Sequence, residues 1–192
     1  MNTIIVGNII CFVGSLIMVA TGLIKNNKNV LKAQSVMHVF LGAGNLVLGG
    51  MSGFIANALS FIRNFFCITG NYNPALKLIF IALQVILTLV TSLKGMGANI
   101  GLATWLPVIA VCVYTWGLDT QNAYVLKGLL IFAQSTWLVY DILIINYSSA
   151  VFDVATIIAN IVGIVLISKG TKKISEEMKE TPSEEERSVT IK

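Results

Sequence analysis

Charged side chains are scarce in this sequence. Only 11% of its 192 residues are charged, whereas 56% are hydrophobic and the mean hydropathy is +0.82. A soluble domain of this length has about a quarter of its residues charged, because its surface must stay in contact with water. The composition therefore excludes an ordinary soluble globular protein.

Acidic residues are almost missing from most of the chain. Before position 169 the only acids are Asp119, Asp141 and Asp153, whereas 169–192 holds six acidic and six basic residues. We therefore expect a transmembrane domain over 1–168 and a charged cytoplasmic tail over 169–192. A segment this polar buries too little apolar surface to fold by itself, so the tail is expected to be partly disordered.

Residues that commonly form metal, disulfide or catalytic sites are also few. Cys11, Cys67 and Cys112 lie far apart inside apolar runs, without the spacing of a metal site or a disulfide framework. No zinc-protease, hydrolase, P-loop or dinucleotide-binding motif occurs. The net charge is +4, but the basic residues of the body stand singly and form no clustered basic stretch. We therefore expect no enzyme activity, cofactor, metal or nucleic-acid partner.

Long apolar runs make up the body of the chain. Each is close to the 20 or so residues that cross a hydrocarbon core about 30 Å thick, and polar turn residues separate them. The first run lacks a basic start and a small-residue cleavage site, so we interpret it as a retained helix. The sequence predicts an all-α membrane protein with seven transmembrane helices, over 3–24, 31–48, 53–70, 76–93, 99–117, 123–145 and 148–168.

Lysine residues fall mainly on one side of this seven-helix map. Cytoplasmic loops of membrane proteins carry an excess of Lys and Arg. Lys94 is alone on one side, while the other side has Lys25, Lys28, Lys32, Lys77, Lys127, Lys169, Lys172 and Lys173. We therefore expect a multi-pass protein of the bacterial inner membrane, in contact with lipid, with the N-terminus outside and the C-terminus in the cytoplasm. The sequence is compatible with a homo-oligomer and does not fix the oligomeric state.

Rare polar residues recur at a constant shift of 96 positions. Three pairs are identical: Asn26 and Asn122, Ser52 and Ser148, and Asn64 and Asn160. Four more pairs are chemically related: His38 and Gln134, Asn45 and Asp141, Asn57 and Asp153, and Ser60 and Thr156. A duplicated three-helix unit explains these gapless matches better than chance.

An odd number of helices inverts a directly joined copy, so a linker helix is needed to keep two such units parallel. The expected arrangement is 3+1+3, with a first repeat over 3–70, a linker helix over 76–93 and a second repeat over 99–168. Parallel repeats of this kind, related by an axis along the membrane normal, occur in transporters, with the binding site near the midplane between the halves.

These features resemble the bacterial inner-membrane protein family called YgjV. The similarity lies in the 3+1+3 layout, in Asn64 and Asn160, and in the stretch Trp137-Leu138-Val139-Tyr140-Asp141 followed by Asp153. The chain is more distantly similar to the SWEET sugar transporters and PQ-loop proteins. That resemblance implies an alternating-access carrier whose paired asparagines face a central substrate cavity. The chain departs from the SWEET pattern because it has no Pro-Gln motif and only Pro107 is placed to kink a helix.

Four uncharged polar residues of the repeat are candidates for binding a solute. The amides of Asn64 and Asn160 could bind a polar solute through donor and acceptor atoms, or join the two halves through interhelical hydrogen bonds. His38, the only histidine, lies opposite Gln134 in the repeat. It could be a hydrogen-bonded packing residue, or it could have a role in the cavity or in proton transfer.

Two aromatic and three charged residues complete the candidate site. Trp137 and Tyr140 share a helix face and could stack on a solute ring, or belong to an interfacial aromatic belt. Asp141 and Asp153 could relay protons, or remain solvated near the outer surface. Arg63 could bind an anionic substrate, or extend to the cytoplasmic headgroups.

Two functions are compatible with these residues. The first is a carrier or facilitator for a small polar metabolite, with its site between the two three-helix units. The second is a membrane scaffold or receptor that transports nothing and uses the same polar residues to hold its helices together. Polar pairs in the membrane favour transport, whereas the scarcity of hinge prolines favours a static bundle.

Overall fold

The computed structural model describes residues 2–21, 27–96, 101–117 and 122–180. Within these ranges the regular structure is all helical, which confirms the all-α part of the prediction. The elements are α1 (Asn2–Thr21), α2 (Asn27–Val47), α3 (Met51–Thr69), α4 (Pro74–Leu93), the 3-10 helix η1 (Gly101–Trp105), α5 (Leu106–Gly117), α6 (Ala123–Leu143) and α7 (Tyr147–Glu180). Each predicted apolar segment therefore corresponds to a helical stretch of the described chain.

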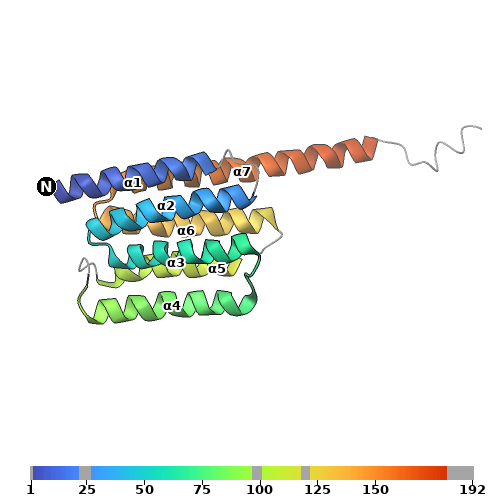
Figure 1. Ribbon diagram of the computed structural model, residues 1–192. Helices are drawn as coiled ribbons and strands as arrows, with labels where there is room; N and C mark the ends of the chain where they lie inside the picture. The colour runs from blue at the N-terminus through green and yellow to red at the C-terminus, as the bar shows by residue number, and fades with distance from the viewer. Residues whose placement is uncertain (1, 22–26, 97–100, 118–121, 181–192) are drawn as a thin grey trace, which may run out of the picture.

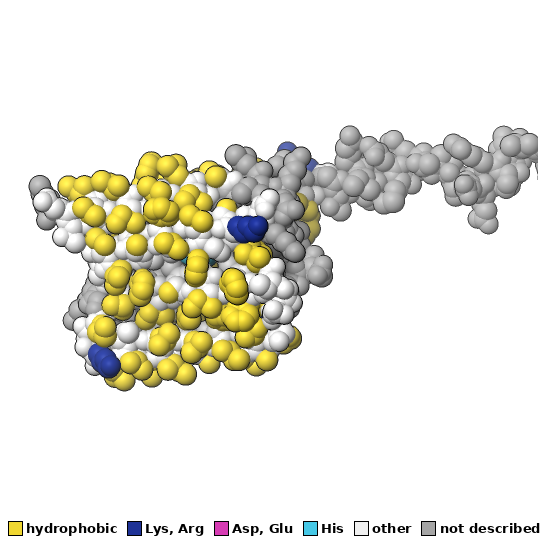
Figure 2. Space-filling view, viewed as in Figure 1, with side chains coloured by type: hydrophobic (Ala, Val, Ile, Leu, Met, Phe, Trp, Pro, Cys, Tyr) yellow, Lys and Arg dark blue, Asp and Glu magenta, His cyan; other side chains and the backbone are white. Residues whose placement is uncertain are grey.

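Four of the described helices are long and apolar enough to span a membrane: Asn2–Ala20, Met51–Thr69, Pro74–Leu93 and Tyr147–Lys169. The stretch Gly101–Gly117 is apolar but shorter. Many large apolar side chains are exposed on the outer surface, and Figure 2 shows them spread over the visible face with few basic groups between them. An apolar surface of this extent suits lipid contact. Seven membrane spans remain a prediction.

Helix boundaries differ from the prediction at several places; α2, for example, begins at Asn27, four residues before the expected start. The segment expected as one helix over 99–117 is divided into η1 and α5, because Pro107 is the second residue of α5. Proline is favoured in the first turn of a helix, where its missing N–H has no intrahelical partner. Pro107 therefore helps to start α5. The prediction that it kinks the middle of a helix is wrong.

The last helix extends beyond the predicted membrane segment. α7 continues without a break from Tyr147 to Glu180, past the expected boundary at position 168. The segment from Lys169 to Glu180 is rich in lysine and glutamate, contains no proline, and so has good helix propensity. Part of the expected tail is therefore helical, and its remainder, 181–192, lies outside the described residues.

Six helices form a closed ring. In order around the ring, α1 contacts α2, α2 contacts α3, α3 contacts α5, α5 contacts α6, α6 contacts α7, and α7 contacts α1. Figure 1 shows the chain passing back and forth, so that α1, α3, α5 and α7 run in one direction. α4 lies outside the ring against α3 and α5, with Phe80 packed on Ile55 and Leu59.

The turns after α2 and α6 have the same backbone structure. In the first, the N–H groups of residues 48, 49 and 50 donate to the carbonyls of residues 44, 46 and 45. In the second, residues 144, 145 and 146 donate to residues 140, 142 and 141, which is the same pattern shifted by 96 positions. The central residue of each turn has a positive φ, 80° at Gly49 and 61° at Ile145. A β-branched residue such as Ile145 rarely adopts a positive φ. The second turn nevertheless has the same shape as the first, although isoleucine stands where the first turn has glycine.

Candidate functional site

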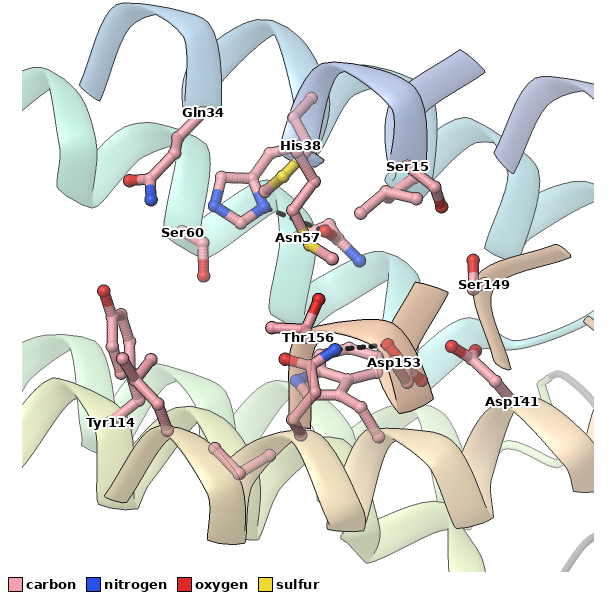
Figure 3. Close-up of a pocket in the computed structure, with 18 of the residues that line it drawn as sticks. Ser15, Gln34, His38, Asn57, Ser60, Tyr114, Asp141, Ser149, Asp153 and Thr156 are labelled. Carbon is pink, nitrogen blue, oxygen red and sulfur yellow. Dashed lines mark hydrogen bonds between the residues drawn. The ribbon is translucent and has the colours of Figure 1, made fainter. Parts of the chain in front are cut away.

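A cavity of about 540 Å³ lies inside the ring, and all six ring helices line it. This volume is within the range of small-molecule sites in proteins. Its polar, charged and large aromatic lining residues are Ser15, Gln34, His38, Asn45, Asn57, Ser60, Arg63, Tyr114, Gln134, Trp137, Asp141, Ser149, Asp153, Thr156 and Asn160. Figure 3 shows polar side chains from both three-helix units pointing into this space.

Two equivalent hydrogen bonds lie on opposite sides of the cavity. In the first unit, Nδ1 of His38 lies 2.9 Å from Oδ1 of Asn57, whose Nδ2 donates to the carbonyl of Gly53. Because Nδ2 of Asn57 donates to Gly53, the group that faces His38 is Oδ1, which can only accept. Nδ1 of His38 is therefore assigned as the donor in this bond. In the second unit, Nε2 of Gln134 donates to Oδ1 of Asp153. The bond from His38 to Asn57 and the bond from Gln134 to Asp153 therefore match at the 96-residue shift, and each joins two neighbouring helices.

Two aspartates lie toward one end of the cavity. Asp141 and Asp153 are 3% and 4% exposed, and their carboxyl groups are close enough to interact. Asn146 donates to Oδ1 of Asp141 at 3.1 Å. Oδ2 of Asp153 and Oδ1 of Asn45 are buried and accept no hydrogen bond from the described residues. This end of the cavity therefore presents oxygen atoms that can accept donors from a bound molecule. The carboxylates are buried rather than solvated near a surface.

Arg63 lies in another part of the cavity, with a different set of neighbours. Its guanidinium is 5.4 Å from the centre of the Tyr114 ring, and its NH1 group donates to Oγ1 of Thr115 at 2.9 Å. Arg63 is only 4% exposed, and its Nε has no partner among the described residues. The side chain therefore lines the cavity and does not extend to the cytoplasmic headgroups.

Tyr140 has a structural position that the sequence did not indicate. It is fully buried, does not line the cavity, and crosses from α6 to the start of α3. Its hydroxyl oxygen accepts from the Gly53 N–H at 2.9 Å and bonds Oγ of Ser52 at 3.2 Å. Trp137 does line the cavity and packs edge-on against Tyr140. Tyr140 therefore joins the two three-helix units at one end of the ring, and only Trp137 is placed to contact a solute.

The two asparagines expected to form a central pair have different surroundings. Asn160 lines the cavity, and its Nδ2 donates to the carbonyl of Thr156 in its own helix. Asn64 is 1% exposed, is absent from the lining, and its Nδ2 has no partner in the described residues. The helices that carry these two residues also have different neighbours. α3, with Asn64, packs against α4 and α5, whereas α7, with Asn160, has no counterpart of α4 beside it. The structure therefore does not bring Asn64 and Asn160 together as a solute-binding pair.

Several lining residues were missed in the sequence. Asn45, Ser60 and Thr156 had a signal, because they belong to the polar pairs that recur at the 96-residue shift. Gln34 and Tyr114 had none, since one polar or aromatic residue in a helix does not reveal which neighbour it faces. Their place in the cavity depends on how the six helices are rotated within the ring.

A ring of apolar helices around a buried polar cavity defines a polytopic membrane protein. A family model described as bacterial inner membrane protein, Imp-YgjV, matches residues 5–171, and the chain belongs to this family. This confirms the resemblance to YgjV proteins and supports a multi-pass location in the bacterial inner membrane. No curated protein and no solved structure matches the chain.

Proposed function

We propose that the protein is a carrier for a small polar metabolite, which binds in the cavity inside the helix ring. The main observation is that buried polar atoms of this cavity, on Asn45, Arg63 and Asp153, have no hydrogen-bond partner among the described residues. An unsatisfied polar group inside a membrane protein costs free energy. A bundle that only holds helices together would gain by pairing such groups, whereas a carrier needs them free for its solute.

The 3+1+3 arrangement of two parallel repeats is part of the same proposal. It is supported by the matching turns, the matching hydrogen bonds of His38 and Gln134, and the equivalent contacts of α1 with α7 and of α5 with α3. In this arrangement α4 is the linker helix outside the ring. Alternating access would then be a rocking of the two three-helix units around the cavity.

The two ends of the ring differ in packing. At the end formed by the α2–α3 and α6–α7 turns, Tyr140, Asn146 and Ile144 are buried. Toward the other end, the lining residues Met18, Gln34 and Tyr114 are partly exposed. In the proposed orientation, with the N-terminus outside, the closed end faces the outside and the cavity is reached from the cytoplasm.

Replacing the two repeat asparagines tests the carrier. We expect Asn160→Ala to abolish solute-dependent thermal stabilisation, because Asn160 lines the cavity, and Asn64→Ala to preserve it. The measurement is the apparent melting temperature of purified protein in detergent with a panel of sugars, polyols, amino acids and organic acids. Uptake of each stabilising compound into proteoliposomes would follow. If no compound shifts the melting temperature and wild-type proteoliposomes take up none of the panel, the protein is a scaffold, which the lack of proline inside the described helices would favour.

The proposed orientation has its own test. We expect a cysteine at Lys94, an exposed residue after α4, to react with a membrane-impermeant maleimide in intact cells. A cysteine at Lys28 should react only after the inner membrane is permeabilised. A background without the three native cysteines is needed, and Asn146 is unsuitable as a labelling site because it is fully buried. Labelling at Lys28 but not at Lys94 would reverse the orientation.

A further inference from the structure

The cavity contains buried charges of both signs at separate positions. Arg63 lies beside Tyr114, while Asp141 and Asp153 lie toward the other end, as Figure 3 shows for Tyr114 and the two aspartates. All three charged residues are less than 5% exposed. Within the described part of the chain, no ion pair joins Arg63 to either carboxylate.

Buried charges without counter-charges are unfavourable, because the lost hydration is not replaced. Natural proteins keep such groups where a ligand supplies the opposite charge. A solute with one charge would compensate only one end of this cavity. A solute with a cationic and an anionic group would compensate both ends at once.

We propose that the solute is a zwitterion of the amino-acid type, with its carboxylate at Arg63 and its ammonium at Asp141 and Asp153. This inference rests on the proposed carrier function and specifies the class of solute.

The surroundings of Arg63 suit a carboxylate. The bond from NH1 to Thr115 and the position of the guanidinium over the Tyr114 ring hold the side chain in place. Its Nε has no hydrogen-bond partner in the part of the chain that the structure describes. A guanidinium presents parallel N–H donors that match the two oxygens of a carboxylate. The fixed guanidinium therefore offers a ready binding site for that group.

The aspartate end suits an ammonium group. Two neighbouring buried carboxylates repel each other, and a cation near them lowers the cost of keeping both ionised. An ammonium group has three N–H donors. Oδ2 of Asp153 and Oδ1 of Asn45 are buried cavity oxygens that accept no hydrogen bond from the described residues, and Asp141 lies near Asp153. A bound ammonium would supply both the missing charge and the missing hydrogen bonds.

The spacing along the helices indicates how the zwitterion must lie. Asn57 and Asp153 lie at a similar level along the helix direction, which runs across the view in Figure 3, and Arg63 is six residues beyond Asn57 on α3. Six residues correspond to about 9 Å of helix rise. Arg63 and Asp153 therefore lie at different depths of the cavity, and a zwitterion bound to both must extend along the helix direction between them.

Matched compounds test the charge requirement on the wild-type protein. The probes are glycine, L-alanine, L-glutamine and γ-aminobutyrate, each compared with the amine that lacks its carboxylate and the acid that lacks its amine. We expect at least one zwitterion to raise the melting temperature in detergent and to bind at least tenfold more tightly than both analogues. If the single-charge analogues bind as well as the zwitterions, the proposal is wrong.

Two variants assign the ends of the solute. Arg63→Gln should remove the preference for a zwitterion over its amine analogue, and Asp153→Asn should remove the preference over its acid analogue. Lys94→Gln, which removes an exposed cation outside the cavity, should change neither preference. Unchanged preferences in a folded Arg63→Gln or Asp153→Asn protein would contradict the assignment.

The outcomes separate this inference from the carrier proposal. If a sugar or polyol stabilises the protein and is taken up by proteoliposomes while no zwitterion binds, the carrier stands and the zwitterion is wrong. If no compound of either panel binds or is taken up, both are wrong.

Discussion

Asn146→Ala is expected to lower the free energy of unfolding by about 2–4 kcal/mol. Asn146 directly precedes α7, and its Oδ1 accepts from the N–H of Ser149 as a helix N-cap does. Its Nδ2 also donates to Oδ1 of Asp141 and to Oγ of Ser149. Loss of a cap costs about 1 kcal/mol, and leaving buried polar partners without a bond costs about 1–3 kcal/mol more.

The control for this variant is Asn73→Ala. Asn73 caps α4 by accepting from the N–H of Leu76 at 2.9 Å, but this bond is exposed. We expect this change to cost only about 1 kcal/mol. Both variants can be measured by denaturant unfolding in mixed micelles, followed by circular dichroism. Equal losses would show that the buried bonds of Asn146 to Asp141 and Ser149 contribute little beyond capping.

The helices were well predicted because lipid imposes a simple requirement on sequence. Apolar runs of sufficient length separated by turn residues located all seven α-helices, and the predicted family membership is confirmed. The predicted helix ends were less accurate, because individual residues near a helix end determine where the helix starts or stops. Pro107 set the start of α5, and the polar but helix-favouring segment after Lys169 extended α7.

The 96-residue shift selected several residues that line the cavity, among them His38, Gln134, Asp141, Asp153 and Asn160. The shift that related His38 to Gln134 and Asn57 to Asp153 also relates the hydrogen bonds that these residues make. The same reasoning failed for Asn64, because equivalent positions in two repeats need not have equivalent neighbours. α3 packs on α4, which has no counterpart beside α7.

The position of Tyr140 could not be predicted from sequence periodicity. Its equivalent in the first repeat is Gly44, so the repeat gave no indication of an aromatic ring at that place. The contact depends on a small residue in a different helix, since Gly53 leaves the space that Tyr140 occupies. Such complementarity between distant segments is visible only once the helices are placed together.

Gly53→Ala is expected to destabilise the protein by about 1–3 kcal/mol, because it over-packs the contact between the two three-helix units. A Cβ at Gly53 would lie 2.8 Å from Cε1 and 2.9 Å from the hydroxyl of Tyr140, and 3.0 Å from Cγ of Asn45. All of these groups are buried, so the chain has little room to adjust. The measurement is the free energy of unfolding in mixed micelles.

Gly128→Ala is the matched control for Gly53→Ala, because a Cβ at Gly128 in α6 meets nothing within 4 Å. Alanine has the higher helix propensity, so this change should stabilise the protein by about 0.5–1 kcal/mol. A double-mutant cycle then identifies the neighbour that must move. If the methyl group introduced by Gly53→Ala displaces the Tyr140 ring, the bond between the Tyr140 hydroxyl and the N–H of residue 53 is already lost, and Tyr140→Phe should cost less in that background than in the wild-type protein. Additive costs would show that Tyr140 keeps its place and that Asn45 yields to the new methyl group.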